Sequence, residues 1–172
     1  MKIFAETNRF YLREIMEQDL PGMFALDADP EVHRYLGNKP VTSMQETEVI
    51  IQNVRKQYQD NGIGRWAIID KNKAAFIGWS GLKLEKNLRK GVEYYDLGYR
   101  LRREYWGQGI ASESAQLALD YGFGTLGLTE IFAAAQVANI ASNKILQKVG
   151  LTFIETFDYE GVATNWYGVQ RT

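Results

Sequence analysis

The stretch RREYWGQGIA, residues Arg102 to Ala111, says more about the fold than any other part of the chain. It joins a predicted strand over residues 93–101, rich in β-forming residues, to a predicted helix over residues 110–123. Gly107 and Gly109, one residue apart, let the backbone approach a ligand without a Cβ in the way. The stretch is therefore a candidate ligand-binding loop between a strand and a helix.

The start of that helix suits a phosphate group. A helix N-terminus carries unsatisfied N–H donors and partial positive charge, and Arg102 and Arg103 add cationic side chains for an outer phosphate. The stretch lacks the Lys-Ser/Thr ending of a Walker loop, and Ser112 stands where a dinucleotide fingerprint has its third glycine. By itself the pattern fits two interpretations. It is either a phosphate-binding loop that belongs to neither of these two nucleotide-binding classes, or only a tight turn.

Periodicity and capping signals predict the remaining elements. In chain order these are a strand over 9–13, helices over 19–28 and 30–36, a helix from the capping box at Ser43–Glu46 to about Asn61-Gly62, strands over 65–70, 75–84 and 93–101, a helix over 110–123, a strand over 130–135, a helix over 142–149, and strands over 153–159 and 162–169. This order predicts a mixed α+β or α/β sheet with helices on its faces. No linker or repeat divides residues 1–172, so we expect a single domain.

Composition narrows the function. The 172 residues are 45% apolar and carry a net charge of −1, which gives no electrostatic reason to expect nucleic-acid or membrane partners. The chain has no cysteine, so disulfides, thiolate metal sites and a cysteine nucleophile are excluded. Met1–Phe10 holds no apolar run of signal-peptide length, and we expect a cytoplasmic protein. The single histidine, His33, follows Asp29-Pro30 and is expected to be a structural helix residue.

A second candidate segment begins at Asn139, after the predicted buried strand over 130–135. Loops at the carboxyl end of such strands are a usual place for ligand contacts, and an Asn side chain can both donate to and accept from an amide-bearing ligand. Ser142 either caps the helix that follows or carries a proton.

Residues 105–113 and 139–151 follow two patterns that occur together in one family. The first reads YWGQGIASE against the pattern YWGxGxAxE, and the second, Asn139-x-x-Ser142 followed by KVGL at 148–151, is close to NxxSxxxxxKxGF. Weaker matches lie at Phe10–Arg13, Asp29–Val32, Tyr35–Gly37, Trp66–Ile68, Ile77-Gly78 and Leu97–Tyr99. On these residues, which span nearly the whole chain, the sequence resembles the GNAT acetyltransferases of the RimJ/RimL type, the ribosomal-protein N-terminal acetyltransferases.

The resemblance implies a GNAT fold, in which a mostly antiparallel sheet of about seven strands has a splayed strand pair and helices on both faces. It implies acetyl coenzyme A as co-substrate, no metal, and a ternary complex in which a primary amine attacks the thioester directly. The family's pantetheine arm would follow the strand that ends at Leu101, where a bulge splays two strands. The expected cofactor-binding residues are Leu101, Arg102, Arg103, Trp106, Gly107, Gln108, Gly109, Ile110, Ala111, Ser112 and Asn139.

The chain departs from the family pattern at two places. Glu104 stands where the general GNAT loop has Gln or Arg, although the RimJ/RimL branch is looser there. Leu146 stands where many GNATs have a catalytic tyrosine, and a leucine has no proton to give. The departing thiolate then needs another acid, and the RimJ/RimL proteins suggest Ser142.

The expected general base is Asp96, on the central strand where relatives often carry Glu; Glu93 and Glu113 are weaker candidates. The alternative is that Asp96 is a half-exposed strand carboxylate without a role. A strand N–H within residues 97–99 would hold the tetrahedral oxyanion.

The acceptor pocket is expected between the early helices and the last hairpin, lined by Tyr35, Trp66, Tyr94 and Trp166, although aromatic residues also fit the core. The acceptor amine itself, a protein N-terminus or a small molecule, is left open. Two rival functions remain: a catalytically silent module that senses acetyl coenzyme A, which Leu146 favours, and a nucleotide-binding protein using the glycine turn. Exposed strands would support a homodimer.

Overall fold

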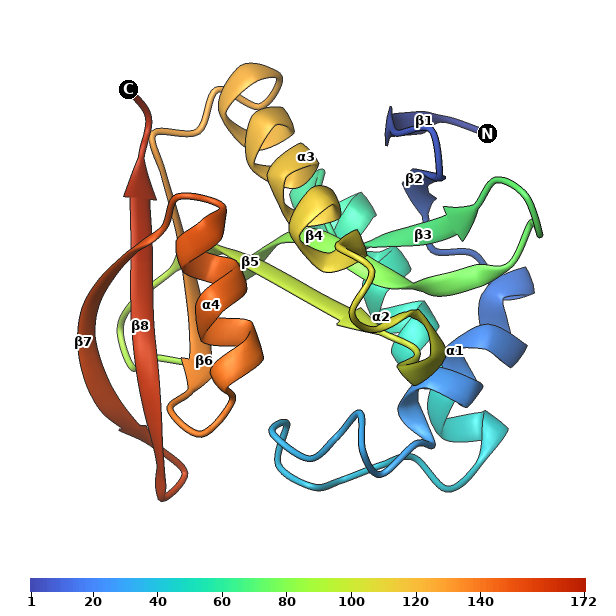
Figure 1. Cartoon of the computed structure of the whole chain (residues 1–172), viewed down its shortest axis with the longest axis horizontal. Coiled ribbons are helices and arrows are strands. Elements are labelled where there is room, and N and C mark those ends of the chain that lie inside the picture. The colour runs from blue at the N-terminus through green and yellow to red at the C-terminus, as the bar shows by residue number, and fades with distance from the viewer.

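A computed structural model describes the whole chain, residues 1–172, as one eight-stranded sheet with helices on both faces (Figure 1). The strands are β1 (Ile3–Glu6), β2 (Phe10–Glu14), β3 (Trp66–Asp70), β4 (Phe76–Glu85), β5 (Tyr94–Leu101), β6 (Glu130–Gln136), β7 (Thr152–Tyr159) and β8 (Val162–Gln170). The helices are α1 (Leu20–Asp27), α2 (Met44–Asn61), α3 (Ile110–Gly124) and α4 (Ile140–Lys148), with short 3₁₀ turns η1 (Glu17–Asp19) and η2 (Arg103–Tyr105).

The strand order is β1-β2-β3-β4-β5-β6-β8-β7, and every neighbouring pair is antiparallel except β5 and β6. The predicted mixed α+β fold is confirmed. The sequence predicted about seven strands and missed β1, which has only four residues. Packing secures this short strand, because the ring of Phe4 stacks on Trp66 with 4.6 Å between centroids.

Strand β3 is buried on both faces, which explains its unbroken apolar run. Alternation along the strand sends Trp66 and Ile68 into the larger core, under α3. Ala67 and Ile69 enter a smaller core with residues of α1 and α2 on the opposite face. Figure 1 shows α3 in front of the sheet and α2 behind it. The sheet thus separates two helical layers.

Helix α2 begins and ends where predicted, but its cap differs in detail. Ser43 Oγ accepts from the N–H of Glu46 at 3.3 Å, as in a capping box. The Glu46 carboxylate reaches back to the N–H of Thr42, at 2.8 Å, rather than to that of Ser43. Gly62 ends the helix in the left-handed conformation, with φ of 72°.

The predicted helix over residues 30–36 is wrong: this segment forms turns. Asp29 does accept from the N–H of the residue two positions on, at 3.0 Å, as a cap would. However, Gly37 and Asn38 follow at once in the left-handed region, with φ of 89° and 53°. The buried imidazole of His33 forms a hydrogen bond with Asp27, the last residue of α1, at 3.1 Å. His33 therefore has the expected structural role, but outside a helix.

Candidate functional site

The loop between β5 and α3 presents free backbone donors. Gly107 and Gly109 have φ of 72° and 80°, a region that residues with a Cβ rarely adopt. Gly109 is the N-cap of α3, and no side chain caps the helix. The first intrahelical bond of the turn runs from Glu113 N to Gly109 O, so the N–H groups of residues 110–112 have no helical partner. Such a helix start suits an anion.

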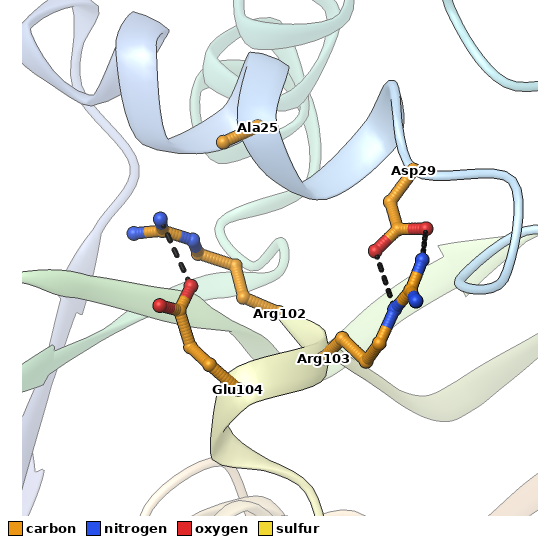
Figure 2. Close-up of a pocket in the computed structure, with 5 residues that line it drawn as sticks. All are labelled: Ala25, Asp29, Arg102, Arg103 and Glu104. Carbon is orange, nitrogen blue, oxygen red and sulfur yellow. Dashed lines mark hydrogen bonds and ion pairs between the residues drawn. The ribbon is translucent and has the colours of Figure 1, made fainter.

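The two arginines predicted to contact a phosphate are already paired with carboxylates. Arg103 Nε lies 3.0 Å from Asp29 Oδ2, and Arg102 Nη2 lies 3.0 Å from Glu104 Oε1. The hydrogen bond from Arg103 lowers the pKa of Asp29 below its usual value. With Ala25 these four residues line a pocket of about 400 Å³ between α1 and η2 (Figure 2). A phosphate contact by either arginine therefore has to compete with its carboxylate.

Another cation, which the sequence did not single out, lies on the glycine loop. Arg9 Nη1 donates to the carbonyl oxygen of Gln108 at 2.7 Å, and Nη2 pairs with Glu113 Oε1 at 2.8 Å. Nη2 is also 3.7 Å from where a Cβ on Gly109 would stand. Only the fold could reveal this contact, because Arg9 is 99 residues from Gln108 along the chain.

Strands β5 and β6 part beside this loop. Their parallel ladder consists of one pair, Asp96 and Phe132. Since Arg102 N donates to a carbonyl of β4, alternation turns the main-chain groups of Leu101 and Tyr99 toward the β6 side. The Leu101 carbonyl accepts from Trp106 Nε1 at 2.8 Å. The expected splay is present, whereas the expected bulge is not: β5 pairs with β4 without a register shift.

Asn139 and Ser142 lie at the start of α4, where one of the two roles considered for Ser142 is a helix cap. Asn139 is the cap, because its Oδ1 accepts from Ser142 N at 3.2 Å, so Ser142 does not cap the helix. The Ser142 hydroxyl instead lies 2.9 Å from the hydroxyl of Tyr99 on β5. Burial raises the pKa of Tyr99 to about 12, and the hydrogen bond with Ser142 opposes this shift. Tyr99 is the hydroxyl that sequence reasoning missed.

Asn143 locks the first turn of α4 to the sheet. Its Nδ2 donates to the carbonyl of Gln136 at 3.0 Å and to that of Asn139 at 2.7 Å. Its Oδ1 accepts from Tyr167 Oη at 2.6 Å and from Asn165 Nδ2 at 2.8 Å. All donor and acceptor positions of the Asn143 side-chain amide are used. This network fixes the position of the preceding residue on α4, Ser142.

Asp96 belongs to a largely buried ion pair. Its Oδ2 lies 2.5 Å from Arg65 Nη2, and the two side chains are 13% and 10% exposed. Arg65 Nη1 also donates to the carbonyls of Asp96 and Gly81, at 2.6 Å each. Burial raises the pKa of Asp96, and the Arg65 guanidinium opposes this shift. The carboxylate thus has a structural partner that the sequence did not reveal.

The four aromatic residues expected around the acceptor do not form one pocket. The prediction for Trp66 is wrong, because its side chain is 1% exposed in the core under α3. Tyr94 and Trp166 are 5% exposed each and pack edge to face, with 4.7 Å between ring centroids. Tyr35 is partly exposed, in the turns before α2, with the Arg34 guanidinium 5.3 Å from its ring. Trp66, Tyr94 and Trp166 pack against other aromatic rings in the core instead of lining a pocket.

No group of three or more His, Asp or Glu side chains is arranged to hold a metal ion. None of the helices has the length and apolar character needed to span a membrane.

Sequence comparisons agree on one family. A family model described as an acetyltransferase (GNAT) domain matches residues 9–152. The chain is 34% identical over 157 residues to the uncharacterized N-acetyltransferase YoaA of Bacillus subtilis (strain 168), covering 91% of this chain and 84% of that protein. It is 25% identical over 142 residues to spermidine N(1)-acetyltransferase of Escherichia coli (strain K12), covering 82% and 72%.

Solved structures share the fold. RimL, a ribosomal-protein α-N-acetyltransferase solved with coenzyme A, superposes with a TM-score of 0.81 at 21% identity and covers 98% of both chains. Spermidine N-acetyltransferase from Vibrio cholerae, solved with coenzyme A and spermine, gives a TM-score of 0.77 at 21% identity and covers 95% of this chain and 96% of that one.

Proposed function

Because the chain belongs to the GNAT acetyltransferase family, and is thus an acetyl-coenzyme-A-dependent acyltransferase, we propose that it acetylates a primary amine by direct attack in a ternary complex. One observation carries this proposal: β5 leaves β6 after a single ladder pair, and the same strand leads into the uncapped start of α3. The loop suits a diphosphate and the gap between the strands suits the acyl arm of the same molecule.

The residues around this gap fit coenzyme A. The free N–H groups of residues 110–112 would hold the diphosphate, with Arg9 beside them as a cation. Around Gly109 only Arg9 comes within 4 Å of the missing Cβ, so the backbone there is open to a ligand. The side-chain nitrogen of Asn139, Nδ2, makes no hydrogen bond within the chain and would donate to the pantetheine. When bound, acetyl coenzyme A supplies an activated acetyl thioester.

The chain's own groups would move the protons. An amine is mostly protonated near neutral pH and has to lose a proton before it attacks. We assign this role to Asp96, directly or through a water, because Oδ1 is not hydrogen-bonded within the chain while Arg65 holds Oδ2. Ser142 is the proposed acid for the departing sulfur. Positioning alone lowers the activation barrier by about 7–11 kcal/mol in well-oriented reactions. Asp96 and Ser142 would therefore add to a rate that proximity already raises.

Two acceptor classes deserve the first tests. One relative is a spermidine acetyltransferase, and one structural neighbour, RimL, acts on a ribosomal protein. The proposal therefore covers polyamines and, for a RimJ/RimL-type enzyme, protein N-termini. A screen that couples acetyl transfer to free-thiol release, with spermidine, peptides bearing a free N-terminus and single amino acids, would identify the acceptor. If none of the amines in the panel causes thiol release, the proposal is contradicted.

A silent acetyl-coenzyme-A sensor is the second candidate, favoured by Leu146, which is 2% exposed and has no proton to donate. Binding and turnover separate the two functions. Both require that coenzyme A raise the melting temperature more than ATP or NAD does; ligand at 100 times its Kd stabilises by about 2.7 kcal/mol. Only the enzyme also releases thiol when an amine is added.

The proposed homodimer has a candidate edge. Strand β7 ends the sheet, and Phe153 and Ile154 are 49% and 50% exposed on it. Unpaired strand edges readily accept a second strand. Light scattering after size exclusion would measure the assembly: twice 19.7 kDa supports the dimer, and the single-chain mass contradicts it.

A further inference from the structure

Tyr99 and Ser142 meet across the gap between β5 and α4. Tyr99 Oη lies 2.9 Å from Ser142 Oγ and 3.2 Å from the main-chain carbonyl oxygen of Ser142. That carbonyl lies inside α4, where helical carbonyls accept from the residue four positions on. Ser142 Oγ has no other hydrogen-bond partner in the chain. Tyr99 thus has two possible acceptors on Ser142, the hydroxyl at 2.9 Å and the carbonyl at 3.2 Å, whereas Ser142 Oγ has Tyr99 as its one partner.

Only one hydrogen lies between these two oxygens, and its origin decides what Ser142 can do. If Ser142 donates to Tyr99, its proton points away from the gap and is not available to a leaving group. If Tyr99 donates to Ser142, the Ser142 O–H is free to point at a third atom. We propose that Tyr99 is a positioning residue for acetyl transfer, whose hydroxyl donates to Ser142 Oγ and so directs the Ser142 proton toward the departing sulfur.

Three features support this direction. Burial raises the pKa of Tyr99 to about 12, so its hydroxyl keeps its proton near neutral pH and has a hydrogen to donate. Asn139 and Asn143 hold the backbone of the turn that carries Ser142, so this residue stays opposite Tyr99. Leu146 leaves the helix without the family's tyrosine, and Tyr99 supplies a phenol from the strand instead.

This inference rests on the proposed function. The proton transfers of the proposed acetyl transfer are as follows. As the C–S bond breaks, its electron pair goes to sulfur, which takes the proton from Ser142 Oγ. The O–H of Tyr99 hydrogen-bonds to the negative oxygen that remains. The amine gives its first proton to Asp96, which passes it to solvent, and it loses a second proton on becoming an amide. That second proton returns to Ser142 through solvent and replaces the one that sulfur took, so the net release is one proton. Tyr99 is protonated at the start and at the end of the cycle.

The test measures thiol release and acetyl-coenzyme-A affinity for the wild type, Tyr99→Phe, Ser142→Ala and the double variant. Tyr95→Phe is the matched control: it makes the same change on the same face of β5, and the Tyr95 hydroxyl has no hydrogen-bond partner within the chain. We expect kcat of Ser142→Ala to fall roughly 100-fold or more, as for loss of an acid. We expect kcat of Tyr99→Phe to fall at least 10-fold, KM for acetyl coenzyme A to change less than 2-fold, and Tyr95→Phe to match the wild type.

The double variant and a solvent isotope effect distinguish positioning from packing. If Tyr99 acts through Ser142, the double variant is no slower than Ser142→Ala, and the isotope effect on kcat in deuterated water falls in both single variants. The inference alone is overturned if Tyr99→Phe keeps the wild-type kcat, changes only KM or melting temperature, or slows Ser142→Ala further by the same factor. A wild type without turnover on any amine overturns the proposed function and this inference together.

Discussion

The guanidinium of Arg65 lies against Gly98 of β5, so that a Cβ at position 98 would come within 2.7 Å of Nη2. Three hydrogen bonds, two to Asp96 and one to the carbonyl of Gly81, hold that guanidinium in place. The largely buried ion pair of β5 therefore depends on a glycine two residues farther along the strand.

Gly98→Ala should destabilise the protein by about 1–3 kcal/mol, as overpacking does, because the new methyl group displaces the Arg65 guanidinium from Asp96. Urea unfolding followed by circular dichroism would measure the change. Gly124→Ala is the control, since nothing lies within 4 Å of the Cβ position at the end of α3, and it should be neutral or stabilising by up to about 1 kcal/mol. Equal stability of Gly98→Ala and the wild type would mean that Arg65 is free to move.

Gly109→Ala should weaken coenzyme A binding. Gly109 has φ of 80°, and an alanine in this left-handed region is strained by about 1–2 kcal/mol. Relief of that strain would tilt the N–H groups at the start of α3. Gly127→Ala is matched to it: φ is 67°, nothing surrounds its Cβ position, and it follows α3 rather than preceding it. Both variants should lose similar stability, but only Gly109→Ala should lose affinity in calorimetric titration with coenzyme A. A comparable loss of affinity in Gly127→Ala would contradict the role of the loop.

Local signals predicted much of this fold from the sequence. The apolar run of β3, the Ser43 cap and Gly62 at the end of α2 act within a few residues, so the sequence displays them directly. The loop before α3 was predictable for the same reason, since Gly107 and Gly109 determine its backbone by themselves.

Long-range contacts account for what was missed. Strand β1 depends on the stacking of Phe4 on Trp66, and that same contact places Trp66 in the core instead of the acceptor pocket. The pairs Arg65–Asp96 and Tyr99–Ser142 join residues 31 and 43 positions apart, and no period or spacing connects them. The residues expected at the cofactor loop are local in sequence, whereas those of the proposed catalytic groups come together only in the fold.

Asn143→Ala should lower the free energy of unfolding by about 2–4 kcal/mol, because it breaks four hydrogen bonds and removes the acceptor of the Tyr167 hydroxyl and of Asn165 Nδ2. It should also raise KM for acetyl coenzyme A, since the turn from Asn139 to Ser142 loses its anchor. Lys144→Ala, next along the helix and exposed, is the control and should change stability by less than about 0.5 kcal/mol. An Asn143→Ala protein as stable as this control would show that the network adds nothing to the fold.

Alkaline pH should destabilise the protein through its buried tyrosines. Burial raises the pKa of Tyr99 to about 12 and also raises the pKa values of Tyr58 and Tyr94, whereas tyrosines in the unfolded chain titrate near about 10. Above that pH the unfolded chain binds fewer protons than the folded one, so the stability that is complete below about pH 10 is lost as pH rises. Each such tyrosine contributes a slope of about 1.4 kcal/mol per pH unit until its folded pKa is reached.

Guanidinium chloride unfolding of the wild type and Tyr99→Phe at a series of pH values would isolate one of these contributions. Phenylalanine has no proton to lose, so the stability difference between the two proteins should be constant below about pH 10. Above it, the wild type should lose stability faster than the variant by about 1.4 kcal/mol per pH unit, up to about pH 12. Parallel curves across the whole range would mean that Tyr99 ionises as readily in the folded protein as in the unfolded chain, and that its hydroxyl is more open to water than its place between β5 and α4 implies.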